Sequence, residues 1–232
     1  NSQYTKDKFI KSSGYIKNIE VVPLGVDVNN KEYSYVNKEK SFCFVGHIKK
    51  RKGLINLLRA LNEIIQIGKY SDTKLYLIGS DKSDTHAHQG YLKECMDYID
   101  THNMGKNIIF TGKVSEKELY EYYKKCKANV LPSININNNF EGFGLIHLEA
   151  NSVGTLTIGS NDCGNETAIN NKKSGYLLEQ NNVDELKDTL IKILKISDEN
   201  YKKISTDCIR HAKNNTWGKY AEKLNNIYKN LR

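Results

Sequence analysis

Several features that mark other protein classes are scarce or missing in this chain of 232 residues. No apolar run approaches the roughly 20 residues that cross a bilayer, so we expect no transmembrane helix, and no signal peptide is evident. The five cysteines are scattered and form no Cys-x-x-Cys pair. An odd, scattered set of cysteines disfavours a disulfide framework or a zinc site and favours a reducing compartment. We therefore expect a cytoplasmic protein.

Positive charge is abundant, with 35 lysine and arginine residues against 27 acidic residues and a formal net charge of +8. This balance is compatible with nucleic acid, an anionic membrane surface or anionic small ligands as partners. The densest basic cluster is KKRK at residues 49–52, and neither a zinc finger nor an RNA-binding aromatic signature accompanies it. We therefore expect no nucleic-acid partner. Two interpretations of the charge stay open: a generally basic surface rich in solvated lysine, and weak association with the anionic inner face of a membrane.

Short apolar segments alternate with segments of helical periodicity from residue 41 onward. Strands are predicted at residues 42–45, 74–78, 107–110, 128–131, 155–158 and 175–178, and one more before them at 19–22. Helices are predicted at residues 4–12, from 54 to 65, at 91–101, 115–125, from 145 onward, and at 183–196, 197–213 and 217–231. The alternation favours a parallel sheet covered on both faces. The predicted fold class is therefore α/β, with a Rossmann-like doubly wound parallel sheet.

The segment FEGFGLIHLEA at residues 140–150 carries the strongest chemical signal, because it places two carboxylates eight positions apart. Glu141 precedes a predicted helix, and Glu149 lies on or near its second turn. Gly142 and Gly144 leave backbone N–H groups uncovered at the start of that helix, where phosphate binds readily. Ionised carboxylates accept hydrogen bonds from sugar hydroxyls. The segment therefore predicts a binding site for a sugar nucleotide.

A second candidate segment is the basic loop GHIKKRKG at residues 46–53, between a predicted strand and a predicted helix. Breaking a bond to a nucleoside diphosphate develops negative charge on the leaving phosphate. A lysine such as Lys52, together with the amides of Gly144 and Leu145, would stabilise that charge most strongly in the transition state. The alternative is a solvated basic loop without a ligand.

These two segments and a third one, at residues 23–27, resemble motifs of the family-4 glycosyltransferases, the large group of retaining GT-B enzymes. Glu141 and Glu149 match the E-x7-E signature, residues 46–53 resemble G-R-x4-K-G, and PLGVD at residues 23–27 resembles the P-x-G-V-D linker. The resemblance implies the C-terminal, donor-binding half of a GT-B enzyme. Such an enzyme transfers a sugar from a nucleoside-diphosphate sugar to a saccharide or lipid-linked acceptor with retention.

The resemblance also implies a division of the chain. Residues 1–24 would be the end of an N-terminal domain and the interdomain linker, and residues 25–213 the nucleotide-sugar-binding Rossmann-like domain. Residues 214–232 would form a C-terminal helix that crosses back towards the N-terminal domain, where Trp217 and Tyr228 resemble the family's closing pattern; its apolar stripe could instead pack on this domain. Because the chain does not begin with methionine, we expect a piece of a longer protein. The N-terminal domain would supply most of the acceptor site, so the isolated chain is expected to be inactive.

Single residues receive roles from the same resemblance. Glu141 would face the sugar hydroxyls near the reacting carbon, Lys52 would hold the diphosphate, and Glu149 would accept hydrogen bonds from the ribose. Glu141 and Lys52 are therefore the expected catalytic residues. The other expected donor-binding residues are Gly46, His47, Gly112, Lys113, Val114, Gly142, Phe143, Gly144 and Leu145.

The clearest departure from the family pattern is His47, which stands where an arginine is expected. A neutral imidazole offers one donor and no charge, whereas arginine offers a permanently charged fork. Either Arg51 or Lys50 compensates, or the diphosphate is held less firmly, or a neighbouring phosphate keeps His47 charged. The base would be contacted by backbone at residues 112–114, a contact that does not distinguish UDP from GDP or ADP.

No Asp-x-Asp pair, the motif that bridges a metal in many other glycosyltransferases, occurs in the chain. We therefore expect no metal and no cofactor. Three alternatives are a GT-B nucleotide-sugar epimerase, a nicotinamide-binding Rossmann domain and a non-catalytic nucleotide- or nucleic-acid-binding module. The nicotinamide alternative is weak because residues 142–144 form a G-x-G but position 147 is histidine rather than glycine.

Overall fold

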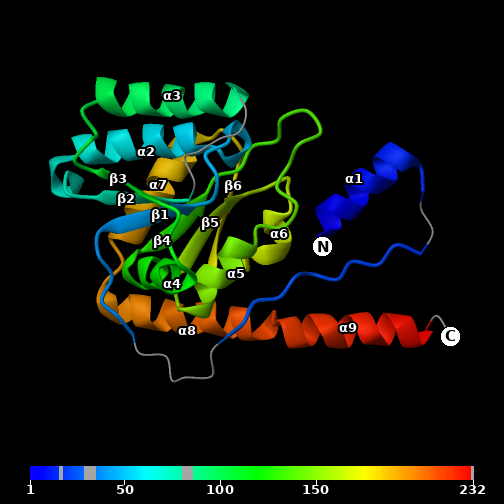
Figure 1. Ribbon diagram of the computed structural model, residues 1–232. Helices are drawn as coiled ribbons and strands as arrows, with labels where there is room; N and C mark the ends of the chain where they lie inside the picture. Colours follow the sequence, from blue (N-terminus) through cyan, green and yellow to red (C-terminus); the bar gives the residue numbers. More distant parts are fainter. Residues whose placement is uncertain (16–17, 29–34, 80–85, 231–232) are drawn as a thin grey trace.

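The computed structural model describes residues 1–15, 18–28, 35–79 and 86–230 (Figure 1). At the centre of this part lies a parallel sheet of six strands in the order β3-β2-β1-β4-β5-β6. The strands are β1 (Ser41–Val45), β2 (Lys74–Ile78), β3 (Ile108–Gly112), β4 (Ala128–Leu131), β5 (Leu156–Ser160) and β6 (Gly175–Leu178). The predicted α/β, doubly wound sheet is confirmed. The strand order reverses between β1 and β4, and sheets of this kind bind ligands at the carboxyl ends of the strands on either side of such a reversal.

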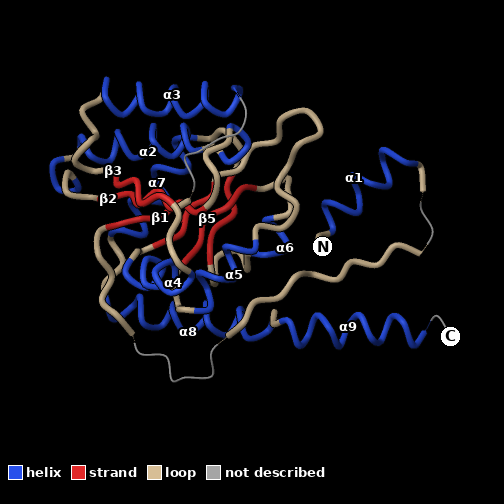
Figure 2. Tube along the Cα trace, in the orientation of Figure 1, coloured by secondary structure: helices blue, strands red, loops and turns tan. Residues whose placement is uncertain are grey.

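Helices cover both faces of the sheet, as Figures 1 and 2 show. One face carries α2 (Leu54–Gln66), α3 (His86–Thr101) and α7 (Val183–Leu194). The other carries α4 (Glu116–Lys125), α5 (Leu145–Ser152) and α8 (Asp198–Asn214). The single turns η1 (Lys50–Lys52) and η2 (Gly68–Tyr70) flank α2, and the short α6 (Asn165–Ala168) follows β5. At the start of α4, Ser115 and Glu118 exchange both hydrogen bonds of a capping box.

The central strand β1 is covered on both faces, which explains why Phe42 to Val45 are all apolar. Successive side chains of a strand point to opposite faces, so Phe42 and Phe44 join the core beneath α2 and α7, whereas Cys43 and Val45 join the core beneath α4. All five residues of β1 are buried. A strand covered on both faces is therefore rigid, and it holds the loop that follows it in a defined position.

Two helices lie outside these layers (Figure 1). Helix α1 (Gln3–Ser13) begins at Ser2, whose hydroxyl accepts a hydrogen bond from the backbone N–H of Thr5, and it ends at Gly14 in the left-handed region. Helix α9 (Trp217–Asn230) continues beyond α8 and has no buried residue in the part of the chain that the structure describes. Its predicted last residue, Leu231, lies outside the described residues.

The predicted strand at residues 19–22 is wrong. Residues 18–25 run as an extended segment without strand pairing among the described residues, and only Val26 forms an isolated bridge, with Thr216. The residues of the predicted strand are partly exposed, because no neighbouring strand lies beside them. An apolar, β-branched run favours a strand only where another strand supplies hydrogen-bond partners.

None of the described helices has the length and apolar character needed to span a bilayer.

The loop between β1 and α2 lies so close to the end of β4 that only glycine fits at its last position. Gly53 has a φ of +70°, and a Cβ added there would lie 1.9 Å from the carbonyl oxygen of Pro132. We expect Gly53→Ala to lower the free energy of unfolding by about 3 kcal/mol, the sum of a left-handed penalty and overpacking. Urea unfolding measures this loss. Gly112→Ala is the matched control, because Gly112 has a φ of +67° but open space around it; equal losses for both variants would contradict the close approach.

Candidate active site

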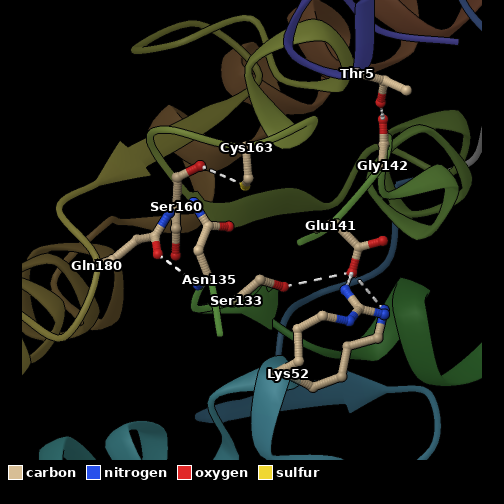
Figure 3. Close-up of polar contacts among 10 residues, drawn as sticks. Thr5, Lys52, Ser133, Asn135, Glu141, Gly142, Ser160, Cys163 and Gln180 are labelled. Carbon is tan, nitrogen blue, oxygen red and sulfur yellow. Dashed lines mark hydrogen bonds and ion pairs between the residues drawn. The ribbon is translucent and has the colours of Figure 1, made fainter. Parts of the chain in front are cut away.

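The candidate site lies where the loop from β4 to α5 meets the loop from β1 to α2. One carboxylate oxygen of Glu141 accepts hydrogen bonds from Lys52 Nζ at 2.5 Å and from Arg51 Nη1 at 2.9 Å (Figure 3). The hydroxyl of Ser133 lies 3.4 Å from the same oxygen. The structure therefore brings the two expected catalytic residues, Glu141 and Lys52, into direct contact, and it adds Arg51 to them.

The three side chains in this contact are largely buried, and two positive charges face one negative charge. Glu141 is 8% exposed. Burial raises its pKa, but Lys52 and Arg51 lower it more strongly, so the pKa of Glu141 lies below its ordinary value. Burial lowers the pKa of Lys52, and Glu141 opposes this shift. An ionised carboxylate thus faces two cations, and the excess positive charge favours an anionic ligand next to the ion triad of Glu141, Lys52 and Arg51.

The amino end of α5 adds a second positive feature to this region. Gly144 precedes the helix with a φ of +80°, and among the described residues no side chain caps the helix start. The orphan N–H groups and the helix dipole therefore remain available to an anion. The G-x-G of residues 142–144 follows β4 and not the first strand of the sheet, which disfavours the nicotinamide-binding alternative.

The turn that follows β5 contacts the backbone of residues 141 and 142. The backbone N–H of Gly164 donates a hydrogen bond of 2.6 Å to the carbonyl of Glu141. A Cβ on Gly164 would lie 2.1 Å from the carbonyl oxygen of Gly142. The segment after β5 therefore holds the loop that carries Glu141 in position. The local sequence around Gly164 gives no sign of this role, because the role depends on a contact with a separate segment of the chain.

Five other predicted donor-binding residues lie at the carboxyl ends of β1 and β3: Gly46, His47, Gly112, Lys113 and Val114. Gly46 and Gly112 lie at the mouth of a narrow cleft of about 10 Å³ there. His47 and Lys113 are exposed, and Val114 is half-buried. Phe143, by contrast, is buried in a separate apolar cluster with Val26 and Leu148. Of the candidates for the missing arginine of the family pattern, Arg51 is the one that points to Glu141.

Glu149 occupies a different part of the same region. It lies on α5 and accepts a hydrogen bond of 3.0 Å from the hydroxyl of Tyr123 on α4. Burial raises the pKa of Glu149, and the hydrogen bond from Tyr123 partly offsets this effect. Val114 packs against the cluster that contains Tyr123. Glu149 is therefore placed on the α4 side of the helix start, toward residues 112–114, whereas Glu141 faces the basic loop.

A buried polar group beneath the α5 start was not recognised as functional from the sequence. His147 is fully buried, and its Nδ1 is hydrogen-bonded to Thr157 Oγ1 on β5. Its Nε2 lies near the side chain of Asn165, which raises the pKa of His147 against the larger effect of burial. A Cβ on Gly144 would lie 2.6 Å from Asn165 Oδ1. His147 and Asn165 therefore form the floor beneath the uncapped helix start. The sequence did contain an indication of this buried group, because His147 is a polar residue within an apolar helical run.

Fold and geometry together define an α/β domain in which the ion triad and the uncapped start of α5 lie beside the reversal of strand order. The sequence matches the family described as Glycosyl transferases group 1 over residues 27–229. The chain belongs to this family.

Curated relatives agree with this assignment. The chain is 24% identical over 189 residues to D-inositol 3-phosphate glycosyltransferase of Corynebacterium efficiens, with 82% of this chain and 42% of the relative covered. It is 23% identical over 207 residues to a GDP-mannose-dependent alpha-(1-6)-phosphatidylinositol monomannoside mannosyltransferase of Mycobacterium tuberculosis, with 83% of this chain and 51% of the relative covered. The chain thus spans about half the length of the curated relatives it matches.

Solved structures share the fold. HepE from Anabaena in complex with UDP-glucose superposes with a TM-score of 0.80 at 16% identity and covers 100% of this chain and 62% of that one. Sucrose-phosphate synthase from Thermosynechococcus elongatus superposes with a TM-score of 0.79 at 18% identity, covering 100% of this chain and 57% of that one. These likenesses show that the sheet and its helices are those of GT-B glycosyltransferases.

The buried His147 makes stability depend on pH. Burial lowers its pKa to about 4, against about 6.5 in an unfolded chain. The unfolded state therefore binds the extra proton first, so the contribution of His147 is present above pH 6.5 and is lost as the pH falls towards 4. We expect this contribution to reach about 3 kcal/mol. Urea unfolding of wild type and His147→Gln from pH 7 to pH 4 measures it. The stability difference between them should shrink on acidification; a constant difference would contradict a buried neutral imidazole.

Proposed function

We propose that the protein is a retaining glycosyltransferase of the family-4 type that transfers a sugar from a nucleoside-diphosphate sugar to a saccharide or lipid-linked acceptor. This chain supplies mainly the donor-binding half. The observation that carries the proposal is the uncapped amino end of α5 beside the two cations of the ion triad. A diphosphate needs both features, because its charge is spread over several oxygens.

The sequence motifs suggest a separate role for each of three parts of the chain. Residues 1–24 would end an N-terminal domain and form the linker, residues 25–213 would bind the donor, and residues 214–232 would cross back towards the N-terminal domain. Without that domain the chain is expected to bind donor but to be inactive in transfer. Weak association of its basic surface with the anionic inner face of the membrane, in the cytoplasm, would suit a lipid-linked acceptor.

Donor binding would change the partners of the ion triad. The diphosphate would lie over the amides of Gly144 and Leu145, next to Lys52 and Arg51. Both cations would then be shared between the phosphate and Glu141. A carboxylate that loses part of its cationic neighbours can accept hydrogen bonds from the sugar hydroxyls. Charge that develops on the leaving phosphate would be stabilised by donors already in position.

The nucleoside half would lie on the α4 side of the helix start. Glu149 would accept hydrogen bonds from the ribose, with backbone at residues 112–114 beside the base. One of its carboxylate oxygens already accepts a hydrogen bond from Tyr123, so the ribose would be bound through the other. A similar structure binds UDP-glucose and a similar sequence uses GDP-mannose, which supports a nucleoside-diphosphate sugar as the class of donor.

Cations and backbone amides would replace a metal in this mechanism. Lys52 and Arg51 contribute two permanent positive charges, and the start of α5 contributes about half a charge more. We therefore propose that transfer needs no metal and no cofactor. Residual activity in excess chelator, measured on the intact enzyme, tests this part of the proposal.

The ribose contact is tested by Glu149→Gln. We expect the affinity for UDP, or for whichever of UDP, GDP and ADP binds best in a thermal-shift screen, to fall by about 1–3 kcal/mol, the range for a hydrogen bond to a charged group. Isothermal titration calorimetry measures the change. Glu121→Gln is the matched control, because Glu121 is exposed and pairs with Lys124 elsewhere on α4. Unchanged affinity in Glu149→Gln would remove this residue from the site.

The sharing of cations predicts an unusual result for Glu141→Gln. Removing the carboxylate charge frees Lys52 and Arg51 for the phosphates, so we expect UDP to bind about tenfold more tightly, or about 1.4 kcal/mol. UDP-glucose should gain less than UDP, because the sugar loses an acceptor. Calorimetry with both ligands gives the ratio of the two affinities. Weaker binding of UDP by Glu141→Gln would contradict competition between Glu141 and the phosphates.

A further inference from the structure

A hollow of about 350 Å³ lies between α1 and the loop that leads to Glu141. We define it by the side chains that line it: Tyr4, Thr5, Lys8, Phe9, Ser12, Asn135, Asn137, Asn138 and Phe140. Its size falls at the lower end of the range for small-molecule sites, roughly 300–1,000 Å³. We propose that this hollow binds a saccharide ring of the acceptor, an inference that rests on the proposed transferase function.

The hollow belongs to the same loop as the expected catalytic carboxylate. Phe140 lines it and immediately precedes Glu141 in the chain. On the other side of Glu141, the hydroxyl of Thr5 donates a hydrogen bond of 3.2 Å to the carbonyl of Gly142. A ligand in the hollow would therefore touch the residue before Glu141 and the helix that is bonded to the residue after it. This is the position that an acceptor needs beside a donor sugar.

Two contacts keep the walls of the hollow together. The rings of Tyr4 and Phe140 meet edge to face with their centroids 5.1 Å apart. The side-chain amide of Asn135 donates hydrogen bonds to the hydroxyl of Tyr4 at 2.9 Å and to the carbonyl of Asp162 at 2.8 Å. The loop is also anchored by Gln180, which accepts a hydrogen bond from the backbone N–H of Asn135 (Figure 3). The hollow is thus preformed by contacts between segments more than 100 residues apart.

The chemistry of the lining fits a sugar better than other ligands. Asn135 uses its amide nitrogen within the protein, but the exposed Asn137 and Asn138 each carry two donors and one acceptor oxygen, which match hydroxyl groups that both donate and accept. Aromatic rings supply flat apolar surface for the C–H faces of a pyranose. No carboxylate lines the hollow among the described residues, and Lys8 is its one cation there, with Nζ 5.2 Å from the centre of the Tyr4 ring. A nucleotide would need more positive charge than this.

Matched pairs of variants test the proposal. Asn138→Ala and Lys8→Ala each remove a lining side chain, whereas the exposed Asn139 of the same turn and Lys11 of the same helix do not line the hollow. The probes are glucose, galactose, mannose, N-acetylglucosamine and maltose, titrated into the 232-residue chain and followed by ¹H–¹⁵N spectra. We expect at least one sugar to shift the amides of residues 135–140 and to bind about fivefold more weakly to Asn138→Ala. Asn139→Ala and Lys11→Ala should bind as wild type does.

Titration with UDP in the same variants separates the two proposals. Asn138→Ala and Lys8→Ala should leave the UDP affinity unchanged, because they do not line the donor site. The acceptor site is overturned if none of these sugars shifts residues 135–140, or if Asn138→Ala and Asn139→Ala weaken sugar binding equally. Failure of UDP to bind any variant, with sugar binding retained, would overturn the donor function and not the saccharide site.

Discussion

The ion triad of Glu141, Lys52 and Arg51 joins the two halves of the sheet at the point where the strand order reverses. Lys52 and Arg51 follow β1, and Glu141 follows β4, so the three side chains link the segments on either side of this reversal. A buried ion pair is seldom more stabilising than apolar side chains of similar volume, because its desolvation cost offsets its attraction. Function is therefore the better explanation for charge at this place. The same groups can bind one another or an anionic ligand.

Close backbone contacts hold this charged group in position. Gly53 lies against the backbone of Pro132, and Gly164 lies against the backbone of Gly142, each at a separation that excludes a Cβ. Loops that touch through backbone atoms cannot shift independently, so the carboxylate, the cations and the helix start keep their relative positions without a ligand. Such preorganisation is what electrostatic stabilisation of a transition state requires.

The sheet was predictable from the sequence because each strand is short and largely apolar and alternates with segments of helical periodicity. The meeting of Glu141 with Lys52 was predictable only through resemblance to a family. Contacts between distant segments were not predictable: the direction of Arg51, the burial of His147 against β5, and the position of α1 beside residues 135–140. The strand expected at residues 19–22 failed for the same reason, because pairing depends on a neighbour that local sequence does not specify.

The central claim is that the amino end of α5 and its adjacent cations bind a diphosphate. The most direct test is a pair of ¹H–¹⁵N titrations of this chain, one with UDP and one with uridine. The account predicts that UDP shifts the amides of Gly144 and Leu145 strongly and that uridine leaves them nearly unchanged, because only UDP brings phosphate to the helix start. Equal shifts from both ligands, or none from UDP, would contradict it.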